Sequence, residues 1–164
     1  MCVPHKLKSY FHQRDFKVDT DTIVRGKIMC CSSSEFDVLY FGNVKKNFLG
    51  HISLYDNYAR LIVRLRCRKC RQEIEVFNSL TDGYDRCIEE ERVDYANIQL
   101  QPFCCSAQTH SNFSVEVTFE YPPRQELLDE GILDSDNAFS WIRITLKCNA
   151  CNKTHKNFVS FETA

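Results

Sequence analysis

The sequence predicts a mainly β fold with short helical insertions, built as two repeated antiparallel β units. Three observations support this. Apolar and polar residues alternate in several short segments, as strands with one buried face require. Close cysteine pairs occur in two forms, Cys-Cys and Cys-x-x-Cys, and both forms appear in the same order in each half of the 164-residue chain.

The clearest strand pattern covers residues 113–120. Phe113, Val115, Val117 and Phe119 alternate with polar residues, which predicts one face in the core and one in water. The same reasoning predicts further strands at 36–41, 61–66, 73–77, 142–147 and 157–161.

Two helical segments are expected between the strands. Residues 124–130 follow Pro123 and end at Gly131, a combination that suits a short helix with proline at its start and glycine just past its end. A second short helix is expected around 84–92. Both are insertions on a β framework.

The repeat is seen when the chain is aligned with itself. Cys-Cys-Ser occurs at 30–32 and 104–106, and each copy precedes a predicted strand. Cys-x-x-Cys occurs at 67–70 and 148–151, and each copy follows one. Eight of the ten cysteines belong to the repeat, whereas Cys2 and Cys87 lie outside it and are interpreted as ordinary thiols. An ordered match of this kind indicates duplication.

The repeat also predicts the domain organisation. Residues 1–22 form an N-terminal segment and 23–80 the first unit. An acidic connector follows at 81–98, and the second unit, at 99–164, carries an insertion at 121–138.

Within each unit the order is cysteine pair, strand, connection, strand, cysteine pair, strand. This order resembles the zinc-ribbon class of small domains over roughly residues 28–79 and 102–162. The resemblance implies a three-stranded antiparallel sheet that brings the two cysteine pairs of a unit together.

The cysteines are expected to bind metal and not to form disulfides. The first residues, 1–16, lack the apolar run of a signal peptide, and no apolar segment is long enough to cross a membrane, so the expected location is the cytoplasm. Thiols stay reduced there, and close pairs of thiolates suit zinc. We expect two structural zinc ions, with eight ligands: Cys30, Cys31, Cys67, Cys70, Cys104, Cys105, Cys148 and Cys151.

Two alternatives remain open at this point. Neighbouring residues of an extended backbone point to opposite faces, so an adjacent pair needs a tight turn to aim both sulfurs at one ion. If only one binds, His110 or His155 supplies the fourth ligand of the second unit, although neither has a histidine counterpart in the first, where Glu75 and the segment before residue 36 take those places. Alternatively, the Cys-Cys pairs are buried apolar residues and both Cys-x-x-Cys pairs share one zinc.

Catalysis is not expected. Four thiolates close a zinc site, whereas a catalytic zinc keeps one position open. Both Cys-x-x-Cys pairs follow strands, not the helix N-terminus typical of redox motifs, and the five glycines form no phosphate-binding loop.

Charge is segregated along the chain despite a formal net charge of −1. Residues 81–138 contain three basic and thirteen acidic side chains, a charge of −10. The leading hypothesis is a non-catalytic protein-binding module that uses this segment to bind a basic partner. The chain resembles bacterial immunity proteins, which neutralise a basic nuclease toxin, in its size, its expected compartment and its lack of catalytic residues. The proposed binding residues are Asp82, Asp85, Glu89, Glu90, Glu91, Asp94, Glu126, Asp129 and Glu130. A charged face that is merely solvated is the simpler interpretation.

The alternative hypothesis is nucleic-acid binding by the first unit. Residues 23–80 contain ten basic and five acidic side chains, and the basic ones cluster at Arg60, Arg64, Arg66, Arg68, Lys69 and Arg71. Such a cluster suits phosphate contact. The competing interpretation is that these cations pair with the acidic stretch that begins at Asp82.

Overall fold

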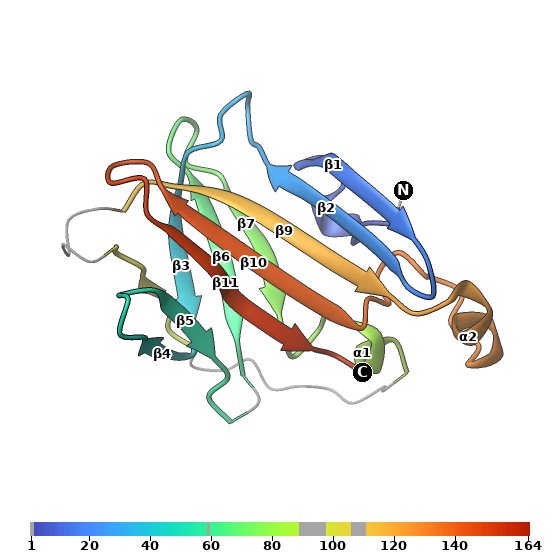
Figure 1. The fold of residues 1–164 in the computed structure, drawn as a ribbon. Coiled ribbons are helices and arrows are strands. Elements are labelled where there is room, and N and C mark those ends of the chain that lie inside the picture. Colours follow the sequence, from blue (N-terminus) through green and yellow to red (C-terminus); the bar gives the residue numbers. More distant parts are fainter. Residues whose placement is uncertain (1, 59, 89–97, 106–110) are drawn as a thin grey trace.

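A curled antiparallel sheet of nine strands forms most of the molecule in the computed structural model, which describes residues 2–58, 60–88, 98–105 and 111–164 (Figure 1). The predicted mainly β class is confirmed. The strands of the sheet are β1 (Phe11–Val18), β2 (Thr22–Ile28), β3 (Phe36–Phe41), β6 (Ile62–Cys67), β7 (Glu73–Asn78), β8 (Gln101–Pro102), β9 (Phe113–Tyr121), β10 (Trp141–Cys148) and β11 (Thr154–Glu162).

The remaining elements are short. A two-stranded hairpin, β4 (Asn43–Lys46) and β5 (Ile52–Tyr55), stands apart from the large sheet. The helical elements are a 3-10 turn η1 (His5–Leu7) and the helices α1 (Tyr84–Ile88) and α2 (Arg124–Asp129). None of the helices in the described ranges has the length and apolar character needed to cross a membrane.

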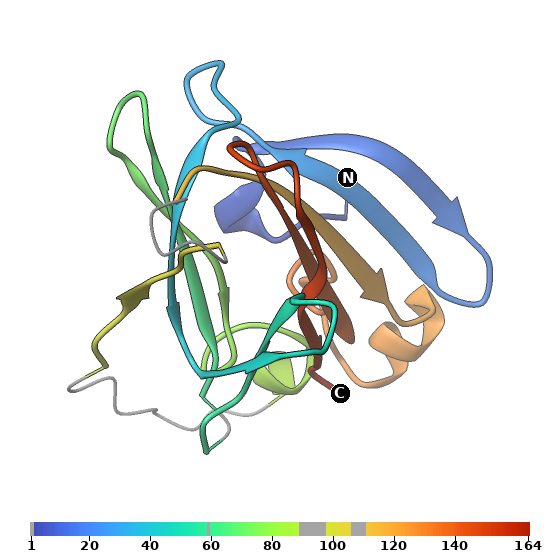
Figure 2. The ribbon, with the colours of Figure 1, turned by 60° about the vertical axis from the view of Figure 1, so that its left-hand side comes forward.

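The sheet has two parts that meet at β9. One part runs β1–β2–β9–β10–β11, and the other runs β8–β3–β6–β7. They are joined where Phe36 of β3 pairs with Phe113 of β9. Figure 2 shows how the sheet curls, with the β4–β5 hairpin crossing the opening so that β5 contacts β11.

The strands predicted from alternation are all present. Every second residue of β9, from Phe113 to Tyr121, is buried, as the alternation predicted. Five strands were not predicted from the sequence: β1, β2, β4, β5 and β8. In β1 every residue after Phe11 is exposed, and in β4 all residues are exposed. Neither strand therefore shows a pattern of alternating burial.

Both predicted helices are present in part. The helix α2 follows Pro123 and ends before Gly131, whose φ of 75° is the left-handed conformation that glycine adopts easily. The helix α1 covers Tyr84–Ile88, and the remainder of the predicted segment lies outside the described residues.

Both halves of the chain contribute to one large hydrophobic core. The ring of Phe77, from the first half, lies 5.2 Å from that of Phe161 in the second. Phe77 also packs against Phe139 of the second half, with ring centroids 6.2 Å apart. The two predicted units therefore share a core. Their strand orders, β3–β6–β7 and β9–β10–β11, are equivalent, but duplication remains a prediction.

A row of four buried residues crosses the sheet at the junction of its two parts. Cys67 pairs with Phe36, Phe36 with Phe113, and Phe113 with Cys148. All four side chains are fully buried. The row therefore connects the start of one Cys-x-x-Cys turn to the start of the other.

Candidate metal centres

The first cysteine cluster lies where two tight turns meet. One turn joins β2 to β3, and in it the backbone groups of Cys30 and Ser33 form two reciprocal hydrogen bonds of 2.8 Å. Cys31 and Ser32 between them have φ angles of 44° and 64°. Two successive left-handed residues make the reversal needed for adjacent cysteines to face the same point. The tight turn required by the sequence analysis is therefore present.

The second turn joins β6 to β7 and contains the Cys-x-x-Cys pair. The amide of Cys67 donates to the carbonyl of Gln72 at 2.9 Å, and the amide of Arg71 donates to the carbonyl of Cys67 at 2.9 Å. Arg71 has a φ of 65°. This compact loop presents Cys67 and Cys70 on its inner side.

The four sulfurs are arranged as a tetrahedral metal site requires. Cys30 Sγ lies 3.5 Å from Cys70 Sγ, and Cys31 Sγ lies 3.7 Å from Cys67 Sγ. All four sulfurs are within 4.8 Å of one another. A zinc ion with Zn–S bonds of about 2.3 Å places its sulfur ligands about 3.8 Å apart. These separations are far longer than the roughly 2 Å of a disulfide, and all four cysteines of this cluster are free thiols.

The pKa values in this cluster show why a cation belongs there. Burial, followed by hydrogen bonds with Cys70 and Cys67, raises the pKa of Cys30 to about 12. Burial also acts to raise that of Cys67, but backbone N–H groups of Cys70 and Lys69 outweigh it and lower the pKa to about 7. Several thiolates in one place repel each other, so a bound metal ion is what would allow all four to ionise.

The second cluster repeats this arrangement with three cysteines. Cys105, Cys148 and Cys151 have sulfurs within 4.8 Å of one another, and Cys105 Sγ lies 3.6 Å from Cys151 Sγ. The loop after β10 has the same hydrogen bonds as the loop after β6, from Cys148 to Lys153 at 2.8 Å and from Asn152 to Cys148 at 2.9 Å. Its residue with positive φ is Asn152, at 59°.

Cys104 does not belong to this group of three. It is partly buried, whereas Cys105 is fully buried and lies beside Cys151 as Cys30 lies beside Cys70. The structure therefore brings together seven of the eight expected ligands. It also keeps the two Cys-x-x-Cys pairs in separate clusters, each with its own partner cysteine.

His155 lies beside the second cluster, with its Nε2 atom 3.4 Å from Cys105 Sγ. Its Nδ1 atom accepts a hydrogen bond from the backbone amide of Ile52 at 3.1 Å. A neutral imidazole that accepts at Nδ1 has its proton on Nε2, so Nε2 is a donor to the sulfur and not a metal ligand. Burial, followed by the charges of Lys153 and His51, lowers the pKa of His155, which favours this neutral form.

The strand register corrects which residue of the first unit corresponds to His155. Leu146 pairs with His155, and Leu65 pairs with Ile74. The residue equivalent to His155 is thus Ile74 and not Glu75. The other expected histidine, His110, lies outside the described residues.

The basic residues predicted to contact nucleic acid are mostly engaged in ion pairs within the sheet. Arg64 lies 3.5 Å from Glu73 and 3.4 Å from Glu75, and Arg66 lies 2.7 Å from Glu73. Asp37 pairs with Arg68 and Arg71 at 3.0 and 3.3 Å. Their partners lie on the neighbouring strands β3 and β7, not in the acidic stretch that begins at Asp82.

The two other basic residues of that cluster form contacts of a different kind. Lys69 Nζ donates to the backbone carbonyl of Cys31 at 3.2 Å, which links the two turns of the first cluster. Arg60 exchanges backbone hydrogen bonds of 3.0 and 3.1 Å with Asn57.

The acidic residues predicted to bind a partner differ in their surroundings. Asp82 forms an ion pair with Lys6 and accepts the amide of Asn78 at 2.8 Å, so it is part of the scaffold. Asp85 is exposed on α1, and Glu126, Asp129 and Glu130 are exposed on or beside α2. Four of the predicted binding residues lie outside the described ranges: Glu89, Glu90, Glu91 and Asp94.

Three of these acidic groups surround one tyrosine. Burial raises the pKa of Tyr84, and the charges of Glu130, Glu126 and Asp85 raise it further. Tyr84 packs against a small apolar cluster that includes Leu127 of α2. The two helices therefore form one acidic end of the molecule.

Comparison with protein-family models, with curated proteins and with solved structures finds no match for this chain.

We predict that the His155→Ala variant still binds metal at the second cluster, with an affinity about 10- to 100-fold lower, because a lost hydrogen bond to a ligand weakens a site without removing a ligand. Competition with a chromophoric chelator measures the affinity, with His12→Ala as control. The visible absorption of the Co²⁺-loaded protein should keep its band positions. A change to a different ligand set in that spectrum would instead make His155 a ligand.

Proposed function

We propose that this chain is a non-catalytic binding protein whose fold depends on two structural zinc ions. The observation that carries this proposal is the cluster of Cys30, Cys31, Cys67 and Cys70. Its four sulfurs occupy all the positions of a tetrahedral ion, which leaves none for a water molecule or substrate. The role expected of such an ion is to hold the fold together.

Zinc is the metal that best suits both clusters. Tetrahedral thiolate sites select zinc or iron–sulfur chemistry over the harder cations. Three thiolates of the second cluster, Cys105, Cys148 and Cys151, fit the same ion, with a fourth ligand still to be assigned. Thiolates that must remain reduced favour a reducing compartment, and we propose the cytoplasm.

The two ions would tie distant parts of the chain together. The first would fasten the β2–β3 turn to the β6–β7 turn, across 36 to 40 residues of sequence. The second would fasten the segment before β9 to the β10–β11 turn, across 46 residues. Each link closes the end of a three-stranded unit, where the strands would otherwise separate.

The first test is the metal content per chain. We predict two zinc ions in the wild-type protein and one in the Cys67→Ser variant, because the substitution removes one of the four thiolates that complete the first site. Cys87→Ser is the matched control, since Cys87 is an exposed thiol on α1 outside both clusters. Elemental analysis and native mass spectrometry measure the stoichiometry. A wild-type protein purified under reducing conditions that has no metal would contradict the proposal.

The second test is the effect of metal removal on stability. Because a structural ion contributes its binding free energy to folding, chelation should lower the melting temperature by about 10 °C or more in a chain of this size. Differential scanning calorimetry with a membrane-impermeant chelator measures the shift, and added zinc should restore it. An unchanged melting temperature in metal-free protein would show that the ions do not hold the fold.

For the partner, we propose a basic protein, as in toxin neutralisation, contacted by the acidic end formed by α1 and α2. Asp85, Glu126 and Glu130 lie around Tyr84, and Leu128 beside them is half exposed. Complementary charge around an apolar contact accelerates association and selects a partner. The internal ion pairs of Arg64, Arg66, Arg68 and Arg71 favour this surface over the first-unit basic cluster.

We predict that reversing two charges at this end abolishes the association. The immobilised protein should retain a basic protein from a lysate of the source cells, and the Glu126→Lys/Glu130→Lys variant should retain at least about 10-fold less, because like charges then face each other. The control is Asp19→Lys/Asp21→Lys, which makes the same change in the exposed β1–β2 turn. Equal recovery by both variants, or recovery of nucleic acid alone, would contradict this binding surface.

A further inference from the structure

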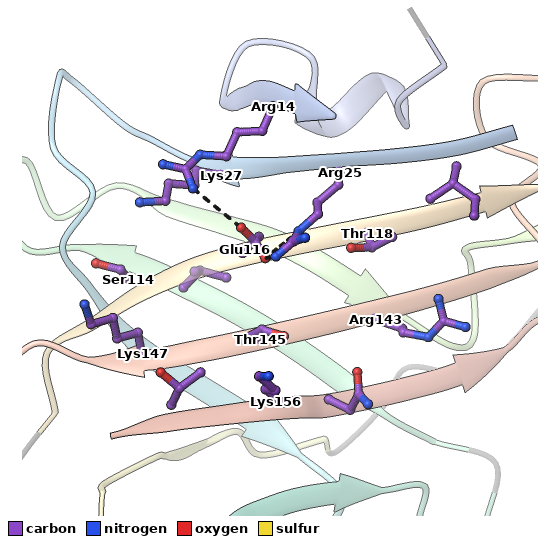
Figure 3. A pocket seen from close by; sticks show the side chains of 14 residues that line it. Arg14, Arg25, Lys27, Ser114, Glu116, Thr118, Arg143, Thr145, Lys147 and Lys156 are labelled. Carbon is purple, nitrogen blue, oxygen red and sulfur yellow. Dashed lines mark hydrogen bonds and ion pairs between the residues drawn. The ribbon is translucent and has the colours of Figure 1, made fainter. Parts of the chain in front are cut away.

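The outer face of the sheet has a hollow of about 650 Å³ that spans β1, β2, β9, β10 and β11 (Figure 3). It lies on the solvent side of the same strands whose inner side forms the core. Its cationic lining comes from four of these strands, which form two hairpins distant in sequence: Arg14, Arg25, Lys27, Arg143, Lys147 and Lys156.

The hollow carries a strong excess of positive charge. Glu116 is its sole acidic lining residue, so six cations face one carboxylate, a difference of +5. Arg25 contacts Glu116 with two nitrogens, at 2.6 and 2.7 Å, and Arg14 approaches it at 3.9 Å. Arg25 also lies 3.9 Å from Asp15, which is outside the lining. Glu116 is thus shared between two arginines, and four cations remain.

Three of those four cations have no acidic partner among the described residues. Lys27, Lys147 and Lys156 form no ion pair in that part of the chain. The fourth, Arg143, contacts Glu120 and lies 5.5 Å from the ring of Trp141. Like charges this close repel one another, so a ligand with several negative charges would stabilise the surface.

Neutral hydrogen-bond donors lie between the cations. Four hydroxyl groups and one amide line the hollow, on Ser114, Thr118, Thr145, Thr154 and Asn157. Arginine, lysine, serine, threonine and asparagine are the side chains that contact the phosphates of nucleic acids. The lining contains no aromatic residue on which a base could stack.

We propose that this hollow binds the phosphate backbone of nucleic acid without reading its sequence. Five strands about 4.8 Å apart make a face about 19 Å wide. A duplex segment of that length carries about 11 phosphates, roughly half of them on the side that faces the protein. The hollow offers six cations to these phosphates, and three of them are lysines without an acidic partner among the described residues. The site goes beyond the proposed protein-binding function and uses neither the acidic end nor the basic cluster of the first unit.

The test is fluorescence anisotropy of labelled 20-base-pair duplex DNA and of the single strand of the same length, from 50 to 200 mM salt. The wild-type protein should bind both with a steep salt dependence. In the Lys147→Gln/Lys156→Gln variant, affinity at 100 mM salt should fall at least about 10-fold, and the slope of log K against log salt should decrease by about 2, because two phosphate contacts are lost.

Two further variants make the result specific to the hollow. Lys45→Gln/Lys46→Gln removes the same net charge from the exposed strand β4 and should leave the affinity within about twofold of wild type. Glu116→Gln removes the carboxylate that Arg25 and Arg14 share, and it should increase the affinity. Unchanged zinc content and melting temperature in every variant would show that the fold is intact.

Four outcomes would overturn the proposal. These are no binding at 50 mM salt, an equal loss of affinity in the β4 control, binding of poly-glutamate as tight as that of DNA, and self-association of the chain that the hollow variant abolishes. The last two would assign the hollow to an acidic protein or to the acidic end of a second copy. None of these outcomes depends on the zinc stoichiometry, so the two proposals fail separately.

Discussion

The pairing of Phe36 with Phe113 is the constraint on which the rest of the structure depends. It joins the two parts of the sheet, and each phenylalanine also pairs with a cysteine of a metal cluster, Cys67 or Cys148. Four adjacent strands place these cysteines about 14 Å apart across the row. Because all four side chains are fully buried, a shift of one strand would disturb both clusters and the core together.

Much of this arrangement was predictable because it depends on local patterns. The alternation in β9 and the spacing of each Cys-x-x-Cys pair are properties of a few consecutive residues. Pairing across the sheet is not local. The arginines of β6 find their acidic partners on β7, and Asp37 of β3 pairs with Arg68. The acidic stretch that begins at Asp82 was the predicted partner of these cations, but the neighbouring strands β3 and β7 supply the acidic groups.

In the second metal cluster, the alignment of the two halves does not predict which residues take which positions. An offset of 74 residues matches Cys31 with Cys105, yet Cys105 is buried beside Cys151 as Cys30 is beside Cys70. The first cluster has Ile74 where the second has His155, so the second cluster has a hydrogen bond to a sulfur that an isoleucine cannot make. Because Ile52 donates to the same ring, the β4–β5 hairpin is tied to the second cluster. No motif in the sequence indicates that contact.

The same alternation that builds the clusters also places charge on the opposite face. In β10, Cys148 points inward to its cluster and Lys147 points outward to the hollow. A metal ion that fixes the end of this strand therefore also fixes the position of a cation on the outer surface. The acidic helices lie at the other end of β9 and β10, near Tyr121 and Trp141. A formal net charge of −1 thus conceals a molecule with one basic face and one acidic end, and a metal ion at the second cluster would hold a strand of the basic face in place.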